Sequence, residues 1–189
     1  YTFRFFVFLN AVDGFHFKFL QVFLKNKLFY KSKINQIFMK IAVTGISGKM
    51  GRVIGSLVIK DEIAELSSGL VRSSSGLEGL DLGEFLGFDK NNILITSNID
   101  EFVKSCDAVI DFSSPSLSLE IAEKCAKYQK VLVCGTTGFI EEEKQKFASF
   151  ATKTVIIWSS NMSLGVNLLM NLVQKVAEIL HDDFDVEIL

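Results

Sequence analysis

Residues that build metal sites and disulfides are scarce in this sequence of 189 residues, which contains three cysteines, two histidines and one proline. Cys106, Cys125 and Cys134 are odd in number and form no Cys-x-x-Cys pair. We therefore expect reduced thiols in a cytoplasmic protein, and no disulfide. His16 and His181 form no cluster with the cysteines, so we expect no metal site.

Long apolar runs are also missing, although 49% of the residues are hydrophobic. Near the N-terminus, Asp13, His16 and Lys18 interrupt the apolar stretches and leave none long enough to span a membrane. Basic charge is scarce in residues 39–189, which hold 14 Lys and Arg against 21 Asp and Glu. An acidic body disfavours nonspecific nucleic-acid binding, so we expect neither a nucleic acid nor a membrane as partner.

Residues 1–38 differ from the rest of the chain. They hold ten of the 18 phenylalanines, and six Lys and Arg against a single acid. Such a segment is compatible with an amphipathic membrane anchor or a transit peptide. The simpler interpretation is that Met39 begins the folded protein, because a strand follows it at once. Residues 1–38 are then upstream sequence read through in translation, with no native structure or function.

Three glycines follow the first clear strand. Residues 40–43 are a short, mostly apolar run typical of a buried parallel strand. After Gly45, Gly48 and Gly51, apolar residues recur at helical spacing from Val53 to Val58. A strand, a glycine-rich turn and a helix are the parts of a dinucleotide-phosphate site, in which the helix start favours the phosphates. An ordinary glycine-rich turn is the alternative.

Strands and helices alternate from Met39 onward, which predicts an α/β fold of the Rossmann type, a doubly wound parallel sheet with helices on both faces. The expected strands are residues 40–44, 66–72, 93–95, 108–110, 130–134 and 154–158. The expected helices are 50–60, 99–104, one that starts with a hydroxyl N-cap at Ser113 or Ser114 before Pro115, one that opens with Glu141–Glu143, and 165–180. Residues 73–92 are predicted to be a mobile loop, and residues 184–189 the start of a further strand.

Ligands of an open α/β sheet bind beyond the carboxyl ends of its strands, so the turns there are candidate sites. After the second strand, the position 20 residues past Gly51 is Val71 and not the acid that NAD sites prefer. Arg72 follows, and its guanidinium suits a 2′-phosphate, which favours NADP. A solvated surface arginine is the alternative.

Three later turns are further candidates. Phe112 either packs against a cofactor ring or belongs to the core, and we expect its neighbour Asp111 to bond a nearby backbone N–H. Gly135–Gly138 offers hydrogen-bonding groups for a nicotinamide or ribose, or forms a plain turn. Ser159–Ser163 is another polar turn, in which Ser163 is either part of the site or the N-cap of the next helix.

Five segments together resemble a known family: Val43–Arg52, Val109–Ser113, Gly135–Phe139, Asn161–Asn167 and Asp185–Ile188. In order and spacing they are similar to the N-terminal domain of bacterial dihydrodipicolinate reductase (4-hydroxy-tetrahydrodipicolinate reductase). The resemblance implies reduction of 4-hydroxy-tetrahydrodipicolinate, a small-molecule substrate, by hydride transfer from NADPH or NADH in diaminopimelate and lysine biosynthesis.

The resemblance also implies which residues bind the cofactor. They are Gly45, Ile46, Ser47, Gly48, Lys49, Met50, Arg72, Phe112, Gly135, Thr136, Thr137, Ser159, Ser160, Asn161 and Met162. Val71 and Ser114 depart from the family, which often has an acid and a basic residue at these places. The first departure weakens the case for NADH and the second removes one phosphate contact, so we expect NADPH to be preferred and NADH to be possible.

The family's substrate domain is largely missing from these residues. Its His-His-x-x-Lys motif and its Lys-x-Asp-Ala-Pro-Ser-Gly-Thr loop are absent, and the single proline is Pro115. We therefore expect a truncated reductase that is inactive alone, with its catalytic histidine and lysine beyond Leu189. Residues 39–165 are then the dinucleotide-binding domain, and residues 166–189 the hinge helix and the start of the substrate domain. By resemblance, the full-length protein is a homotetramer.

Two other functions compete with this one. A non-catalytic NAD(P)-binding or redox-sensing module needs no catalytic half, but such a module usually carries a partner-binding domain, and none is visible in the sequence. A short-chain dehydrogenase has a similar glycine pattern. Its Tyr-x-x-x-Lys motif, however, is absent after Tyr1, Tyr30 and Tyr128.

Overall fold

The computed structural model describes residues 7–8 and 38–180 of the chain. The rest of the Phe-rich extension, His181 and the strand expected at residues 184–189 lie outside the described residues. The described chain divides by its internal contacts into one unit that ends at Trp158 and a second that begins at Ser159.

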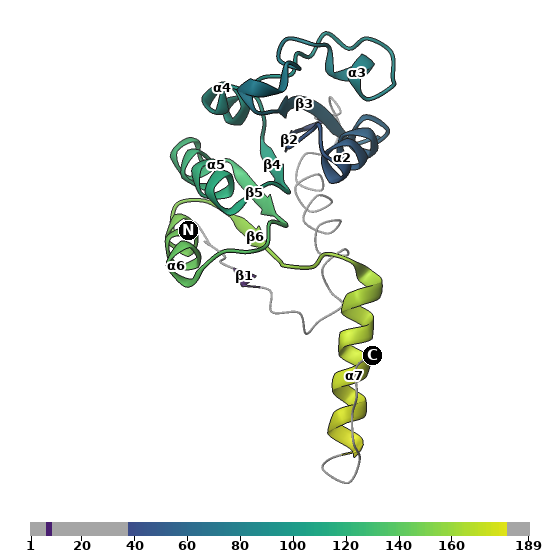
Figure 1. The fold of residues 1–189 in the computed structure, drawn as a ribbon, viewed down its shortest axis with the longest axis vertical. Coiled ribbons are helices and arrows are strands. Elements are labelled where there is room, and N and C mark those ends of the chain that lie inside the picture. The colour runs from purple at the N-terminus through teal and green to yellow at the C-terminus, as the bar shows by residue number, and fades with distance from the viewer. Residues whose placement is uncertain (1–6, 9–37, 181–189) are drawn as a thin grey trace, which may run out of the picture. The chain divides into compact units, whose positions relative to one another are not determined.

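A parallel sheet of six strands forms the centre of the first unit (Figure 1), in the order β1-β6-β5-β4-β2-β3. The strands are β1 (Val7–Phe8), β2 (Met39–Thr44), β3 (Ala64–Leu70), β4 (Ala108–Asp111), β5 (Val131–Cys134) and β6 (Ile156–Trp158). Short apolar strands suit this sheet because parallel strands are covered on both faces. The predicted Rossmann-type parallel sheet is confirmed.

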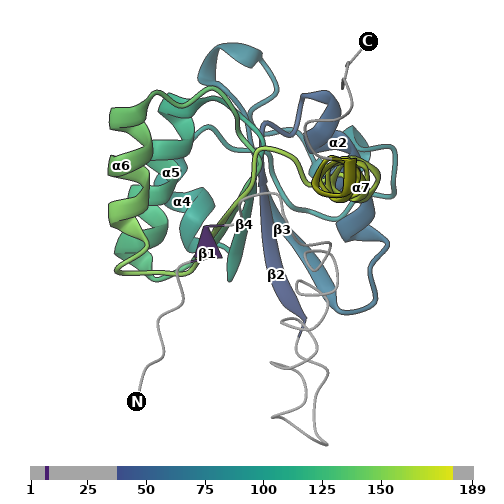
Figure 2. The same cartoon turned by 90° about the horizontal axis from the view of Figure 1, so that it is seen from below.

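Helices cover both faces of the sheet, with α4, α5 and α6 on one side and α2 on the other (Figure 2). Their bounds are α2 (Lys49–Ile59), α3 (Leu82–Phe85), α4 (Ile99–Lys104), α5 (Pro115–Tyr128) and α6 (Glu141–Phe150), with a 3-10 turn η1 at Ser73–Ser75. Two apolar cores result. Phe102, Ile121 and Phe147 belong to the core under α4, α5 and α6, whereas Ile46 and Val58 belong to the core under α2.

The chain reverses its direction across the sheet at β2. From β2 it passes through α2 to β3 on one side, whereas β4 pairs with the other side of β2. Such a reversal is the topological switch point, where ligands of open α/β sheets bind. The glycine turn follows β2 directly and therefore lies at this point.

The third predicted strand is wrong. Residues 93–95 form no strand, because the chain there makes only isolated bridges, between Leu94 and Asp81 and between Thr96 and Leu70. The bridge at Thr96 is parallel and lies beside the end of β3, where the third strand of a Rossmann sheet would stand. A single bridge between Leu70 and Thr96 therefore stands at the sheet edge in place of the strand.

The segment 73–92 is built around a carboxylate and is not a loop without regular structure. It contains η1 and α3, and the Asp81 carboxylate accepts hydrogen bonds from the backbone N–H groups of Glu84, Asn91 and Asn92 at 2.7 to 3.2 Å. These bonds hold the pKa of Asp81 below its ordinary value, against the opposing effect of desolvation. An aspartate at a helix N-cap was the local signal for this order.

Two predicted helix starts differ in how they are capped. Ser114 is the N-cap of α5 and Pro115 its first residue, but the predicted hydroxyl cap is wrong, since the Ser114 side chain makes no capping bond. At α6, the Glu143 carboxylate accepts a hydrogen bond from the Ile140 N–H at 3.0 Å, as an acid in the first turn favours.

The second unit contains α7 (Leu164–Leu180). The predicted apolar face is present, but Val166, Leu169, Val173 and Val176 are each at least 39% exposed. Asn167 is buried instead, and its side-chain amide donates to the carbonyls of the chain just before the helix. Among the described residues, none of the helices has the length and hydropathy that a membrane span requires.

Candidate functional site

The turn after β2 is fixed by backbone contacts. Gly45 has a φ of +58°, in the left-handed region that favours glycine. The Ile46 N–H donates to the Leu70 carbonyl at 3.2 Å, and the Gly48 N–H donates to the Gly45 carbonyl at 2.8 Å. The first bond ties the turn to the end of β3 and the second closes the turn on itself.

The start of α2 packs directly on this turn at Gly51. A Cβ at Gly51 would lie 2.1 Å from the Gly45 carbonyl oxygen, so a larger residue cannot fit without moving the backbone. The N-cap of α2 is Gly48, which has no side chain to cap the helix, and no acid lies in the first turn. Free N–H groups and a positive dipole end therefore remain at the helix start. This cradle fits the pyrophosphate of a dinucleotide.

The predicted cofactor residues of this turn differ in exposure. Ser47, Gly48, Lys49 and Met50 are exposed. Ile46 has no exposed surface and its side chain belongs to the core under α2. Ile46 therefore supports the turn and offers no exposed group to a cofactor, since its N–H bonds to the Leu70 carbonyl.

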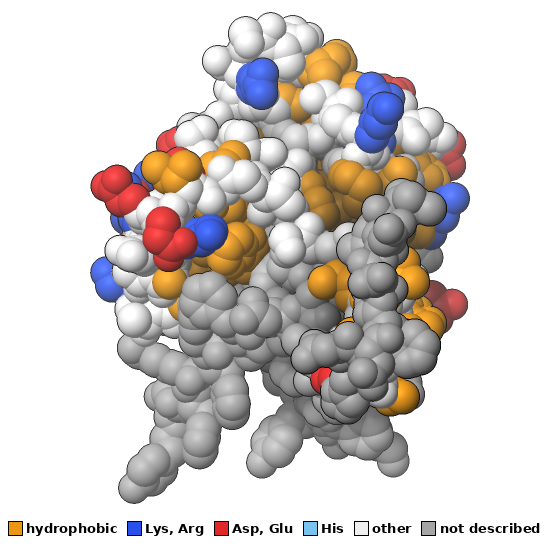
Figure 3. Space-filling view, turned by 60° about the horizontal axis from the view of Figure 1, so that its bottom comes forward, with side chains coloured by type: hydrophobic (Ala, Val, Ile, Leu, Met, Phe, Trp, Pro, Cys, Tyr) orange, Lys and Arg blue, Asp and Glu red, His pale blue; other side chains and the backbone are white. Residues whose placement is uncertain are grey.

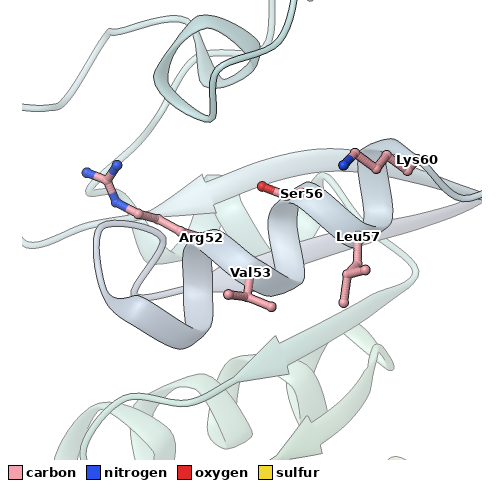
Figure 4. A pocket seen from close by; sticks show the side chains of 5 residues that line it. All are labelled: Arg52, Val53, Ser56, Leu57 and Lys60. Carbon is pink, nitrogen blue, oxygen red and sulfur yellow. The ribbon is translucent and has the colours of Figure 1, made fainter.

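Arg52 holds the turn from the helix side, a role that the sequence did not predict. Its Nε donates to the Ser47 carbonyl at 3.3 Å, and its guanidinium lies 4.4 Å from the centre of the Phe85 ring. An open hollow along α2 is lined by Arg52, Val53, Ser56, Leu57 and Lys60 (Figure 4). No predicted cofactor residue lines this hollow, and Arg52 is the lining residue that also contacts the turn after β2.

A buried carboxylate lies at the end of β4. Asp111 has no exposed surface. Its Oδ1 accepts from the hydroxyls of Thr44 and Ser113, its Oδ2 accepts from the Ser118 hydroxyl, and the Cys134 thiol lies 3.5 Å from Oδ2. The expectation that Asp111 bonds a backbone N–H is wrong, because its described partners are side chains from β2, β5, α5 and the neighbouring turns.

Thr136 belongs to the same network. Its Oγ1 accepts from the Ser113 N–H at 2.9 Å and lies 3.4 Å from Asp111 Oδ2, while its carbonyl accepts from the Trp158 indole N–H at 3.0 Å. Thr136 is 4% exposed, whereas Thr137 is exposed. Thr137 therefore offers the accessible hydroxyl of this turn.

Phe112 connects the turn after β2 with the turn after β5. A Cβ on Gly135 would lie 2.1 Å from Cε1 of the Phe112 ring, so the ring rests directly on the glycine backbone. The Phe112 carbonyl oxygen lies 3.6 Å from the place of a Cβ on Gly45. The ring is half-buried, which leaves part of it accessible at the edge of the sheet.

Arg72 lies at the carboxyl edge of the sheet, directly after β3 and Val71. The Val71 N–H donates to the Thr96 carbonyl at 3.0 Å, and the Arg72 carbonyl accepts from the Ser75 N–H at 2.9 Å. These bonds fix the backbone on both sides of Arg72, while its side chain is exposed.

The predicted residues Ser159–Met162 fall in the second unit. The Ser159 hydroxyl donates to the Asn161 carbonyl at 2.9 Å, and Ser160 and Met162 are exposed. Ser163 Oγ accepts from the Val166 N–H at 3.4 Å, which makes it the N-cap of α7, one of the two alternatives for this residue. A cofactor contact from this segment stays a prediction.

The three cysteines are free and buried, as expected for reduced thiols. Burial raises the pKa of the Cys106 and Cys134 thiols to about 12, so both are neutral and unreactive at pH 7. Among the described residues, no group of three or more His, Cys, Asp or Glu side chains is placed to hold a metal ion.

Charged side chains of the two signs are mixed on the face drawn in Figure 3. Lys and Arg, in blue, stand apart from one another among acidic, neutral and apolar side chains. The described side chains on this face therefore lack the continuous basic stripe that nucleic-acid-binding surfaces present.

The fold and its turns define a dinucleotide-binding domain of the Rossmann type. Comparison with known families identifies the family of this domain: residues 39–162 match the family described as "Dihydrodipicolinate reductase, N-terminus". The chain belongs to this family. A dinucleotide-binding domain in a reductase family supports NAD(P)H as the class of cofactor.

Curated relatives carry the same family name. The chain is 40% identical over 151 residues to a 4-hydroxy-tetrahydrodipicolinate reductase of Roseobacter denitrificans, covering 80% of this chain and 56% of the relative. It is 42% identical over 151 residues to the enzyme of that name in Bartonella tribocorum, covering 79% and 56%. The chain thus spans little more than half the length of the curated relatives it matches.

Solved structures agree with the fold. The dipicolinate-bound dihydrodipicolinate reductase of Paenisporosarcina sp. TG-14 is similar with a TM-score of 0.61 and 25% identity, over 75% of this chain and 54% of that chain. The apo scyllo-inositol dehydrogenase of Lactobacillus casei has a TM-score of 0.54 at 18% identity, over 77% and 44%. The second likeness shows the shared fold alone.

Proposed function

We propose that this chain is the cofactor-binding part of a 4-hydroxy-tetrahydrodipicolinate reductase, an enzyme that reduces 4-hydroxy-tetrahydrodipicolinate to tetrahydrodipicolinate with NAD(P)H in diaminopimelate and lysine biosynthesis. The observation that carries the proposal is the turn after β2. There Gly45 and Gly51 bring an uncapped helix start to the switch point of a parallel sheet. Membership of the reductase family supports the choice of reaction.

The residues of the first unit fall into those that contact the cofactor directly and those that act through a neighbour. The backbone N–H groups of Ser47, Lys49 and Met50 bind the pyrophosphate at the helix start, while that of Gly48 is used inside the turn. Gly135 and Thr137 are assigned to the nicotinamide end, where the Phe112 ring packs on Gly135. The Thr136 side chain acts indirectly, because it is buried in the Asp111 network.

The chain's proposed part in the reaction is to bind and orient the cofactor. Bound NAD(P)H supplies the hydride that reduces the substrate. By the family resemblance, the proton donor belongs to the substrate domain, outside residues 1–189, so we expect residues 1–189 alone to bind the cofactor without turnover. Contacts from Ser159–Met162 near the domain hinge, and a homotetramer of the longer protein, are proposed on the same resemblance.

NADPH is the proposed preferred cofactor. Arg72 is exposed at the carboxyl end of β3, with its backbone fixed by bonds to Thr96 and Ser75. A guanidinium there can bind a 2′-phosphate through paired, charge-assisted hydrogen bonds. Val71, which is buried, takes the place of the acid that would bind the ribose hydroxyls of NADH.

Titration of the 189-residue chain with NADPH and with NADH tests the function. Energy transfer from Trp158, the single tryptophan, to the reduced nicotinamide reports binding. We expect saturable binding of both, with NADPH tighter. Arg72→Ala should weaken NADPH by about tenfold, the usual size of a lost charge-assisted hydrogen bond, and leave NADH unchanged.

The matched control is Lys153→Ala, which removes one exposed positive charge from the turn that follows the C-terminal end of α6. This variant should bind NADPH and NADH with the affinities of the parent chain. Absence of saturable binding by the parent chain contradicts the proposed function. Equal affinities of the parent for NADPH and NADH contradict only the role of Arg72.

A further inference from the structure

One buried carboxylate lies beneath the three turns that the proposed function uses. Thr44, which donates to Asp111, ends β2 and directly precedes Gly45. Ser113, a second donor, is in the turn after β4, and Thr136 is in the turn after β5. A single side chain thus contacts the base of each turn.

The network around Asp111 is unusual in its chemistry. The carboxylate has no exposed surface, and its described partners are three hydroxyls at short distance, a more distant threonine hydroxyl and a thiol. Burying a carboxylate is costly unless hydrogen bonds replace its water. A carboxylate can, however, accept from several donors at once, which no apolar side chain can do.

The consequence is a fixed distance between turns that are far apart in sequence. Ser118 donates to Asp111 from the first part of α5, so the helix after β4 is held to the same point. Phe112, next to Asp111, is then held with its ring on Gly135 and its carbonyl oxygen near Gly45. Small shifts of Asp111 would therefore move all three turns.

We infer that Asp111 is a positioning residue of the cofactor site, which sets the turns after β2, β4 and β5 relative to one another without touching the cofactor. This inference rests on the proposed function. It differs from a purely stabilising role, because it requires cofactor affinity to change in protein that is still folded. The emission of Trp158 without cofactor provides a second signal, since its indole N–H bonds to the Thr136 carbonyl.

Three variants of the full 189-residue chain separate these roles. Asp111→Leu keeps the branched heavy-atom skeleton with bulkier ends and removes every hydrogen bond of the side chain. Asp111→Asn keeps the shape of the side chain. It also keeps part of the network, because its amide can accept from Thr44 and donate to Ser118 after the hydroxyls rotate. Val109→Ala, a buried position on the same strand, weakens the core without touching the network.

We expect Asp111→Leu to weaken NADPH binding by about tenfold in folded protein and to shift the emission of Trp158. Asp111→Asn should restore affinity to within about threefold of the parent and return the emission towards it. Val109→Ala should lower the unfolding midpoint and leave both affinity and emission unchanged. Equal affinity and emission in the parent and Asp111→Leu overturn the inference.

If Asp111→Leu does not fold, Ser118→Ala decides, because it changes no residue of the three turns and removes one donor to Asp111, together with its bond to Thr136 Oγ1 at 2.9 Å. We then expect about threefold weaker binding together with a shifted emission, and an unchanged affinity overturns the inference. Absence of binding by the parent chain contradicts the proposed function, and with it any cofactor role of Asp111. Binding by the parent with no change in the variants contradicts the role of Asp111 alone.

Discussion

The turn after β2 differs from the turns after β4 and β5 in what fixes its shape, although Asp111 contacts the base of all three. The first is fixed by backbone contacts around Gly45 and Gly51, and its side chains from Ser47 to Met50 are exposed. The other two are fixed by side chains gathered on buried Asp111. A site for phosphates needs free N–H groups and no side chains in the way, whereas a site for a ring needs walls in fixed positions.

This contrast predicts how each region fails. The glycine turn should be sensitive to added atoms, since a Cβ at Gly51 meets backbone that cannot move far. The turns around Asp111 should be more sensitive to lost hydrogen bonds than to an added methyl group, since a Cβ at Gly135 meets the Phe112 side chain and not backbone. Substitutions that add one methyl group to each region test the contrast directly.

The largest effect is expected for Gly51→Ala. Its new Cβ would lie 2.1 Å from the Gly45 carbonyl oxygen, so the turn and the helix start must separate. We expect a loss of about 3 kcal/mol in the free energy of unfolding, at the upper end for overpacking, together with loss of NADPH binding. Urea unfolding followed by circular dichroism measures the first, and the NADPH titration the second.

Gly55→Ala is the matched control on the same helix. Its Cβ would lie 2.8 Å from Ile46 Cδ1 and 2.9 Å from Leu86 Cδ1, which are the ends of flexible side chains. The strain is offset by the better helix propensity of alanine, about 1 kcal/mol, so we expect stability within about 1 kcal/mol of the parent. Equal losses for the two variants would show that the turn is no more constrained than the rest of the helix.

A smaller effect is expected for Gly135→Ala, because the new Cβ meets a side chain. The Phe112 ring, 2.1 Å from that Cβ, is half-buried and can turn away. We expect a loss of about 2 kcal/mol in stability. In a Phe112→Ala background the same change should cost at least about 1 kcal/mol less, a coupling that urea unfolding of the double-mutant cycle measures.

Phe150→Ala, at the end of α6, provides the comparison for that cycle. Phe150 is half-buried like Phe112, but it is not among the neighbours of a Cβ at Gly135. We expect its effect to add to that of Gly135→Ala. Coupling as strong as that with Phe112 would mean that the methyl group disturbs the whole sheet and not one ring.

The features that the sequence predicted are those fixed by neighbours along the chain. The helix at Ile99–Lys104 has the predicted ends, and β2 begins one residue before the predicted strand. The glycine turn was recognisable because a positive φ and a close helix approach each demand glycine locally. Hydrophobic period and turn chemistry are local properties, so one sequence is enough to show them.

The features that the sequence did not predict depend on which strands become neighbours. Thr44 and Asp111 are 67 residues apart and meet only because β2 pairs with β4. The bond between Arg52 and Ser47 and the stacking on Phe85 likewise need the folded turn. The signal in the sequence for the hydrogen-bond network of Asp111 was Thr44, a polar residue at the end of an apolar strand. The third strand failed because its apolar run was too short to outweigh the bonds centred on Asp81.

The smallest effect is expected at Asp100, a carboxylate that contrasts with Asp111 because it is accessible and has a charged partner. It joins α4 to α5 by accepting hydrogen bonds from Lys124 Nζ and the Tyr128 hydroxyl. These bonds, that of Lys124 first, lower the pKa of Asp100 from 3.8 to about 2. A carboxyl whose pKa is lower in the folded state stabilises the fold above its unfolded pKa, and this stabilisation is lost as the pH falls through the folded value.

The thermal midpoint of Asp100→Asn should therefore lie below that of the parent at about pH 6, and the difference should shrink as the pH falls towards about 2. The change should be modest, because ion pairs near the surface are screened by solvent. In a Lys124→Gln background, Asp100→Asn should change the thermal midpoint much less, and with little dependence on pH. The reason is that the lysine makes the largest contribution to the lowered pKa of Asp100. A difference that stays constant over this pH range would mean that Asp100 acts through packing between α4 and α5 and not through its charge.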